Sequence, residues 1–236
     1  MMDLGAYINE LGTKARKAAI EMARADSATK RDALLRIAEA VEKHSGRILE
    51  SNARDLAAGK AAGLTQAMLD RLTLTEKRIV AMAHAIAEIA DQPDPVGEIE
   101  HSVIRPSGIR VGRMRVPIGV IGIIYEARPN VTTDAAALCL KAGNACVLRG
   151  GKEALHSNVA LARVVSETAA AAGLPPDAVQ LVSITDRETV SLMAQAEGLI
   201  DVIIPRGGEA LIRSVVAAAK VPVIKHYKGV CHTFVD

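Results

Sequence analysis

Three short segments of the sequence combine charged side chains with glycine or asparagine, and each directly follows an apolar run. They are residues 125–132 (YEARPNVT), 149–152 (RGGK) and 205–209 (PRGGE). Glycine lets a backbone approach a ligand closely, and flanking cations favour an anion such as a phosphate. Free N–H groups add to that attraction where such a segment begins a helix. Together the three segments predict a site for a phosphate-bearing ligand.

The first two segments also have purely structural interpretations. Arg128 could pair with Glu126 while Asn130 caps the next helix, because turns and caps favour these residue types. The segment 149–152 could be a plain strand-to-helix turn whose charges are solvated. Both interpretations stay open on the sequence alone.

Two common nucleotide-binding motifs are absent. A Walker loop would need glycine where Cys146 stands, and Ser or Thr where Glu153 follows Lys152. No GxGxxG fingerprint occurs anywhere in the chain. The pattern therefore argues against a P-loop ATPase and indicates only a ligand that carries phosphate.

The three cysteines do not suggest a disulfide framework or a metal site. Cys139 and Cys146 stand among apolar neighbours and are typical of small core residues. Cys231 lies near His226 and His232, but no acidic residue stands at ligand spacing. We expect no bound metal and no nucleophile from these positions.

Composition excludes several classes of protein. The 236 residues are 50% hydrophobic but only 2% aromatic, and the net charge is +2. So few rings cannot build base-stacking platforms, and so balanced a charge does not suit a nucleic-acid binder. The longest run without a charged residue, 116–125, is about half of the roughly 20 residues that cross a bilayer. With no export signal at the start of the chain, we expect a cytoplasmic protein with neither nucleic-acid nor membrane partners.

Two kinds of element must position the three segments. Apolar residues at helical spacing predict that the first ninety residues are mostly helices, one of them beginning after Thr75. Residues 101–116 predict a β-hairpin that turns at 106–108, with a bulge at Gly112 where the alternation slips. After Pro117, apolar runs alternate with amphipathic stretches. The expected strands are 120–125, 146–148, 180–183, 200–204 and 221–224, and the expected helices begin near 132 or 133, 157, 187 and 209.

Near-continuous apolar strands that alternate with helices are typical of a parallel sheet covered on both faces. We therefore predict an α/β protein: a Rossmann-type parallel sheet with helices on both faces, preceded by a helical segment and a β-hairpin. Ligands of such sheets bind beyond the carboxyl ends of the strands, and all three segments fall at such ends.

These segments resemble a known family. Residues 115–132 (RVPIGVIGIIYEARPNVT), 141–144 (KAGN), 148–153 (LRGGKE), 205–209 (PRGGE) and 223–226 (VIKH) closely resemble the gamma-glutamyl phosphate reductases, also called glutamate-5-semialdehyde dehydrogenases, of the aldehyde dehydrogenase superfamily. The helical part, including 70–73 (DRLT), looks like the same family, so the resemblance runs from about residue 10 onward. It implies an aldehyde-dehydrogenase-like fold and NADPH-dependent reduction of L-glutamyl 5-phosphate to L-glutamate 5-semialdehyde with release of phosphate, in L-proline biosynthesis.

The resemblance also implies roles for individual residues. Cofactor binding is expected at Arg149, Gly150, Gly151, Lys152, Arg206, Gly207, Gly208 and Glu209. Lys152 stands where NAD-preferring relatives place a glutamate, and its charge would attract the 2′-phosphate of NADP. Arg128 and Asn130 belong to the loop that supplies an amide to the oxyanion hole in relatives.

The same resemblance implies three parts of the chain. Residues 1–100 would be a helical segment packed on the cofactor domain, 101–225 the NADP-binding domain, and 226–236 the start of a catalytic domain. His226 stands where hydrolytic relatives carry a glutamate base, which a reductase does not need. A homo-oligomer is expected for the full-length protein.

One departure from the family limits the activity that we expect. The family's nucleophilic cysteine belongs to a motif like Arg-Pro-Gly-Val-Cys-Asn, and no such motif occurs in the chain. We therefore expect the 236 residues to bind NADP but not to form the acyl-enzyme. Two alternatives stay open: another acyl-phosphate or aldehyde dehydrogenase, and a non-catalytic nucleotide-binding fragment.

Overall fold

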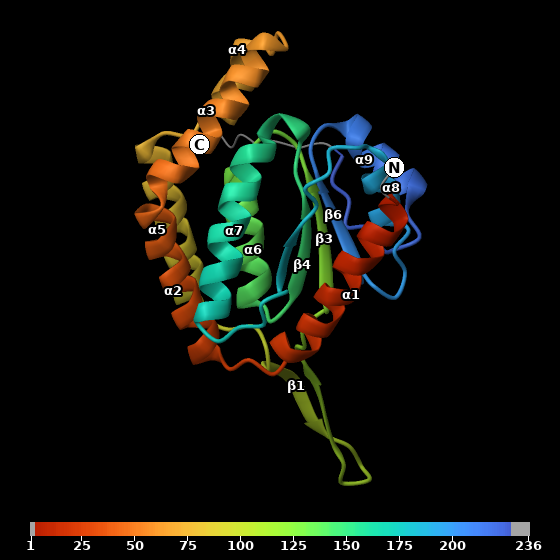
Figure 1. Cartoon of the computed structure of the whole chain (residues 1–236). Coiled ribbons are helices and arrows are strands. Elements are labelled where there is room, and N and C mark those ends of the chain that lie inside the picture. The colour runs from red at the N-terminus through yellow and green to blue at the C-terminus, as the bar shows by residue number, and fades with distance from the viewer. Residues whose placement is uncertain (1–2, 228–236) are drawn as a thin grey trace, which may run out of the picture.

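A parallel sheet forms the centre of the molecule in the computed structural model, which describes residues 3–227 (Figure 1). Its strands are β3 (Val120–Tyr125), β4 (Ala145–Arg149), β5 (Val179–Leu181) and β6 (Val202–Arg206), in the order β5-β4-β3-β6. Every residue of β3 and β4 is buried, because helices cover both faces of the sheet. The predicted α/β fold, a Rossmann-type parallel sheet with helices on both faces, preceded by a helical segment and a β-hairpin, is confirmed.

The strand order fixes which helices cover which face. The chain moves from β3 to β4 and β5 through α6 (Asn130–Lys141) and α7 (Leu155–Ala171), with a short 3-10 turn at Lys152–Ala154. It then crosses back to β6 through α8 (Glu188–Ala194) and continues into α9 (Glu209–Ala218). Because right-handed crossovers run in opposite directions, α6 and α7 cover one face of the sheet, and α8 and α9 cover the other.

The N-terminal helices extend these layers. The first helix, α1 (Leu4–Met22), packs against β4 and α8, whereas α2 (Ser27–Lys43), α3 (Ser45–Ala61) and α5 (Glu76–Asp91) cover α6 and α7. The short α4 (Gln66–Leu72) lies at the far end of α3 (Figure 1). Apolar residues of α2 and α5 belong to the same buried cluster as those of β3 and β4. Thr75 caps α5 as predicted, because its hydroxyl accepts from the N–H of Arg78.

No helix in the described part of the chain is both long and apolar enough to cross a membrane.

The hairpin formed by β1 (Ile99–Ile104) and β2 (Arg110–Met114) projects from the body at the amino ends of the sheet strands (Figure 1). The bulge predicted at Gly112 lies in the other strand of the hairpin, so the predicted position is wrong. The extra residue lies opposite, between Glu100 and Val103, where His101 has a φ of 51°. A Cβ at Gly112 would come within 3.1 Å of the Ile99 side chain, so the glycine makes room for the bulge of its partner.

Other boundaries shift modestly. The helix expected near Thr132 begins at Asn130, and Pro129 occupies the N-cap position. The last expected strand, 221–224, forms a single parallel bridge from Val223 to Ile203. The remaining expected strands and helices are present within a few residues of their predicted positions.

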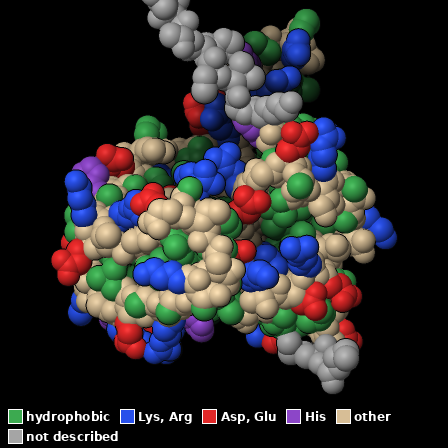
Figure 2. Space-filling model, turned by 90° about the horizontal axis from the view of Figure 1, so that it is seen from above, with side chains coloured by type: hydrophobic (Ala, Val, Ile, Leu, Met, Phe, Trp, Pro, Cys, Tyr) green, Lys and Arg blue, Asp and Glu red, His purple; other side chains and the backbone are tan. Residues whose placement is uncertain are grey.

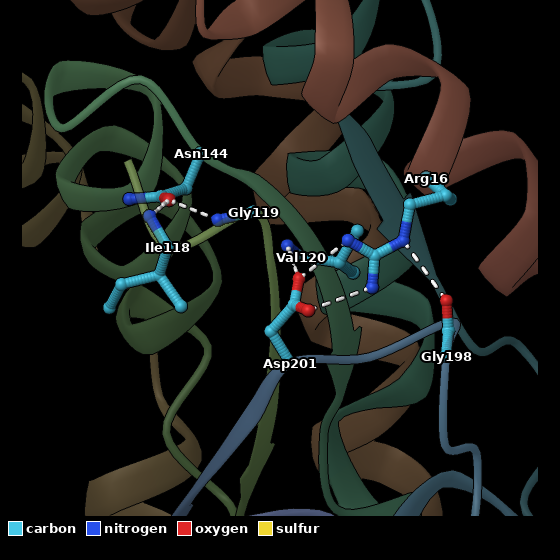
Figure 3. Close-up of polar contacts among 7 residues, drawn as sticks. All are labelled: Arg16, Ile118, Gly119, Val120, Asn144, Gly198 and Asp201. Atoms are coloured by element: carbon cyan, nitrogen blue, oxygen red, sulfur yellow. Dashed lines mark hydrogen bonds and ion pairs between the residues drawn. The ribbon is translucent and has the colours of Figure 1, made fainter. Parts of the chain in front are cut away.

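The two edges of the sheet face opposite ends of the molecule. The carboxyl ends of the strands lie away from the hairpin, at the top of Figure 1, and Figure 2 looks down onto that edge. At the amino edge, a network of side-chain hydrogen bonds joins α1 to the segments that lead into β3 and β6, and joins the segments that lead into β3 and β4 (Figure 3).

Two side chains carry that amino-edge network. The Oδ2 atom of Asp201 accepts from the N–H of Val120 at 2.8 Å, while both carboxylate oxygens accept from the guanidinium of Arg16 at 2.7 and 2.9 Å. The Oδ1 atom of Asn144 accepts from the N–H groups of Ile118 and Gly119 at 2.7 and 2.9 Å. Gly119 has a φ of 123°, and a Cβ there would lie 2.2 Å from Asp201, so only glycine fits.

Candidate functional site

A cleft opens at the carboxyl edge where the strand order reverses, between β3 and β6. Loops from both strands line a cavity of about 760 Å³, together with Arg71 of α4, Glu153 after β4, and His226. In Figure 2, Lys and Arg side chains and Asp and Glu side chains border the hollow on this face. Open α/β sheets bind ligands at this reversal point, because helix N-termini and strand ends converge there.

The loop after β6 presents free backbone donors to the cleft. Gly207 and Gly208 precede α9, and no side chain caps the first N–H groups of that helix. Arg206 is exposed and has no carboxylate within 4 Å among residues 3–227. Uncapped N–H groups beside a free guanidinium fit a pyrophosphate. The carboxylate of Glu209, by contrast, binds Arg213 on the same helix at 2.7 Å.

One acidic group opposes an anion in this cleft. The side chain of Glu126, which follows β3, lies over Gly207, so that a Cβ at Gly207 would come within 2.6 Å of the Glu126 carboxyl carbon. The N–H of Glu126 donates to the carbonyl of Arg206 at 3.2 Å, which ties the two loops together. Its carboxylate must turn away for a pyrophosphate to approach Gly207, because like charges repel. As an exposed side chain it can do so.

The glycines after β4 pack closely against the protein itself, and their contact with a cofactor stays a prediction. A Cβ at Gly150 would lie 2.1 Å from the Asn158 amide nitrogen, and one at Gly151 would lie 2.5 Å from the Glu153 carboxylate and 3.2 Å from the Ala127 nitrogen. The space that a side chain would need is filled by the protein itself. These glycines therefore allow close packing of the loop, whether or not a ligand also lies against it.

The two cations of this loop are placed very differently. Arg149 is only 9% exposed, and its guanidinium donates to the carbonyls of Gly150 at 3.0 Å and Thr185 at 3.1 Å. Burial lowers the pKa of Arg149. Lys152 is exposed and has no ion-pair partner among residues 3–227. Lys152 is thus open to a ligand, whereas Arg149 mainly holds the loop after β5.

Buried polar groups fix the helices behind the cleft. The hydroxyl of Thr132 donates to Asn158 Oδ1 at 3.0 Å. Because its proton is used there, it accepts from the Tyr125 hydroxyl, which lies 2.7 Å away. Burial raises the pKa of Tyr125, so this chain of hydrogen bonds is neutral at ordinary pH. It joins β3, α6 and α7 and leaves their loops with a rigid support.

A second cavity of about 390 Å³ adjoins the first. It lies between the α4–α5 region and the start of α6, and the first-loop residues Arg128 and Asn130 line it. Arg128 makes no ion pair with Glu126, because only its backbone N–H reaches that residue, at the carbonyl oxygen. Asn130 is the first residue of α6, and its amide donates to Asp134 Oδ2 at 2.9 Å instead of capping the helix. The structural alternative for this loop is therefore wrong in both contacts.

Two residues of these cavities lay outside the sequence prediction. Arg71 lines both cavities and Asp134 lines the second. Arg71 stands in the DRLT segment, 57 residues before Arg128, and nothing in its local pattern indicates that it lines the same cavities as the loop after β3. The polarity of that segment at the end of a helix was the only available signal.

The described cysteines cannot supply a nucleophile to the cleft. Cys139 and Cys146 are free and buried. Contact with the Cys139 thiol and complete burial raise the pKa of Cys146 well above its usual range. Cys231 and His232 lie outside the described residues, as does most of 226–236. Within residues 3–227, no three His, Cys, Asp or Glu side chains gather as metal ligands.

Known proteins resemble the chain over nearly its whole length. The sequence model of the Aldehyde dehydrogenase family matches residues 5–230. Gamma-glutamyl phosphate reductase of Geotalea daltonii is 57% identical over 235 residues, which cover 100% of this chain and 56% of that protein. The chain thus spans about half the length of the curated relatives it matches.

Solved structures show the same fold. The crystal structure of gamma-glutamyl phosphate reductase from Thermotoga maritima has a TM-score of 0.90 and 39% identity, covering 92% of this chain and 53% of that one. A NAD-dependent benzaldehyde dehydrogenase from Corynebacterium glutamicum has a TM-score of 0.75 at 23% identity, covering 93% of this chain and 44% of that one. The second likeness shows the fold alone.

Proposed function

The chain belongs to the aldehyde dehydrogenase family, and on that basis we propose that it is the cofactor-binding part of an NADPH-dependent reductase. The reaction would convert L-glutamyl 5-phosphate to L-glutamate 5-semialdehyde with release of phosphate, in L-proline biosynthesis. The observation that carries this proposal is the 57% identity, over the full chain, to a gamma-glutamyl phosphate reductase. The cleft at the strand reversal, with its uncapped helix and free cations, supports it.

The residues of the cleft suit parts of the cofactor. The N–H groups that begin α9, with Gly207, Gly208 and Arg206, would hold the pyrophosphate. Lys152, exposed beyond β4, would meet the 2′-phosphate of NADPH. Arg149 would act indirectly, by fixing the loop after β5 that borders this region. Once bound, the nicotinamide supplies the hydride that reduces the acyl group.

The described residues bind and orient but hold no attacking thiolate. In the proposed reaction a cysteine thiolate takes the acyl group, and neither buried cysteine can reach the cleft in ionised form. We therefore assign cofactor binding to this chain, and to Asn130 and Arg128 a contact with the reacting acyl group. Steady NADPH oxidation with glutamyl phosphate by the 236-residue chain would contradict this division of roles.

The cofactor preference can be tested by binding alone. We expect Lys152→Glu to weaken NADPH binding about tenfold and to leave NADH binding unchanged, because only NADPH carries the extra phosphate. Nucleotide fluorescence titration of the chain measures both dissociation constants. Lys77→Glu, an exposed lysine on α5, is the matched control. An unchanged ratio of the two constants in Lys152→Glu would contradict the NADP preference.

Assembly and location extend the same proposal. We expect the full-length protein to be a cytoplasmic homo-oligomer. The exposed apolar side chains of the hairpin, such as Ile99, Ile104 and Met114, support self-association. Light scattering of the purified protein measures its oligomeric state, and a monomer at all concentrations would contradict the expectation.

A further inference from the structure

Two arginines stand where the two cavities meet. Arg71, near the end of α4, and Arg128, in the loop after β3, line both the cofactor cleft and the second cavity. Both are exposed, and within residues 3–227 neither has a carboxylate within 4 Å. Neighbouring arginines do pair: Arg78 binds Asp70 at 2.9 Å. The junction therefore presents two guanidinium groups, from distant parts of the sequence, that the protein leaves without a partner.

The backbone around Arg71 is held in place on both sides. The guanidinium of Arg78 donates to the carbonyls of Asp70 at 2.6 Å and Thr73 at 2.7 Å. The buried amide of Asn52 donates to the carbonyl of Leu72 at 2.8 Å. Side chains thus satisfy three carbonyls of the four-residue segment 70–73. A turn fixed in this way can present Arg71 at little entropic cost.

A carboxylate without a cation lines the second cavity but not the cofactor cleft. Asp134 is half-buried, accepts from the Asn130 amide, and has no ion-pair partner in the described chain. Burial raises its pKa, and a bound cation would offset that effect. The other acid of the cavity, Asp70, is already paired with Arg78. The cavity thus carries unpaired positive charge at the junction and unpaired negative charge inside.

We propose that the second cavity is the substrate's site: Arg71 and Arg128 bind its phosphoryl oxygens at the junction, and Asp134 binds its ammonium group. This inference rests on the proposed function. A hydride donor held in the cleft requires the acyl carbon at the junction, and the phosphoryl group is linked to that carbon through one oxygen. The α-amino group lies at the other end of the glutamyl chain, inside the second cavity. Arginine suits the first end because its planar fork binds phosphoryl oxygens in pairs.

The phosphate end can be tested with inorganic phosphate as the probe. Phosphorus NMR titration of the 236-residue chain, saturated with NADPH to fill the cofactor's own phosphate sites, measures its dissociation constant. We expect Arg71→Gln and Arg128→Gln each to weaken phosphate binding about tenfold. Arg24→Gln, an exposed arginine on the first connecting turn, should not change it. Arg206→Gln, on the cofactor loop, should not change it either under saturation.

The ammonium end is tested by two amino-acid probes. L-Glutamate carries the ammonium group and glutarate lacks it, so the chain should prefer L-glutamate. Asp134→Asn should remove this preference while leaving phosphate binding unchanged. Circular dichroism of each variant shows whether it folds, and Asp134→Glu, which retains the charge, should restore part of the preference.

Several results would overturn the inference. In the phosphate titration, these are no saturable binding, equal phosphate affinity of the chain and the Arg71→Gln/Arg128→Gln double variant, or loss of phosphate binding in Arg206→Gln instead. In the amino-acid test, it is equal binding of L-glutamate and glutarate. NADPH titration of the same chain separates this failure from that of the proposed function. A chain that binds NADPH but fails these tests contradicts only the substrate site, and one that passes them without binding NADPH contradicts the cofactor assignment.

Discussion

The two edges of the parallel sheet differ in how they use their polar groups. At the amino edge, Asp201 and Asn144 accept five hydrogen bonds, three from backbone N–H groups at the start of β3 and two from the Arg16 guanidinium on α1 (Figure 3). At the carboxyl edge, Arg71, Arg128 and Arg206 line the cleft without a carboxylate partner among residues 3–227. One edge is internally satisfied, and the other holds unpaired cations.

The polar residues of the amino edge thus stabilise the fold, whereas the free cations of the carboxyl edge are available to a ligand. A hydrogen bond within the protein stabilises the fold by about 1 kcal/mol net, and a buried donor or acceptor that has lost its partner destabilises the fold by more. Exposed cations cost little, because water solvates them until an anion arrives. Substitutions at the amino edge should therefore change stability, and substitutions of free cations at the carboxyl edge should change binding.

Asp201→Ala should destabilise the chain most, by about 3 kcal/mol, because it leaves the N–H of buried Val120 and the guanidinium of Arg16 without their acceptor. Urea unfolding measures the loss. Asp32→Ala, which removes an exposed pair with Arg36 one helical turn away, should cost less than about 0.5 kcal/mol. Equal losses of unfolding free energy in the two variants would show that the amino-edge network stabilises the chain no more than an exposed ion pair does.

Gly150→Ala should destabilise the chain by about 2 kcal/mol, although it lies at the carboxyl edge. The new Cβ would collide with the buried, hydrogen-bonded Asn158 amide. Gly46→Ala, on α3 with no atom within 4 Å of the new Cβ, should instead stabilise the chain slightly. Thermal unfolding of both variants checks the opposite signs. If Gly150→Ala leaves stability unchanged and only weakens NADPH, the glycine serves the ligand and not the packing.

Arg206→Gln should weaken NADPH binding roughly tenfold, about 1.4 kcal/mol, and leave the free energy of unfolding unchanged. The reason is that its guanidinium has no partner within the described protein. Nucleotide titration and urea unfolding of one preparation measure both quantities. Loss of stability with intact NADPH binding would place Arg206 among the structural residues.

Gly207→Ala should lower the free energy of unfolding only slightly, by less than about 0.5 kcal/mol. The group that its Cβ would meet is the side chain of exposed Glu126, which can rotate away. The matched comparison is Gly150→Ala, whose obstacle is buried. A loss as large as that of Gly150→Ala would mean that Glu126 is fixed over the loop and that the carboxyl edge is less open than its charges indicate.

Local pattern predicted the framework of the molecule well. The apolar runs at 120–125 and 146–148 are buried strands because only a strand covered on both faces needs no polar alternation. Thr75 begins α5 because its hydroxyl accepts from the helix's own first turn. The bulge was predicted at the right level of the hairpin but in the wrong strand, since an alternation that slips in one arm can be accommodated by an extra residue in the other.

Site residues were predicted as segments more reliably than as single side chains. All three segments border the carboxyl edge, because parallel strands end there whatever their sequence. Arg149 and Lys152 have the same charge and stand three residues apart, yet one is buried against carbonyls after β5 and the other is exposed. Their difference depends on Thr185, which is far away in the chain.

By itself, the sequence determined the α/β layering and the edge of the sheet at which a phosphate-bearing ligand could bind. Both follow from periodicity and from glycine and charge at strand ends, which are local properties of the chain. That Gly150 makes room for Asn158, and that Arg71 and Arg128 line the same two cavities, follows from the packing of the elements. Such contacts join residues that are distant in sequence, and the burial and charge around each side chain exist only once the elements have packed.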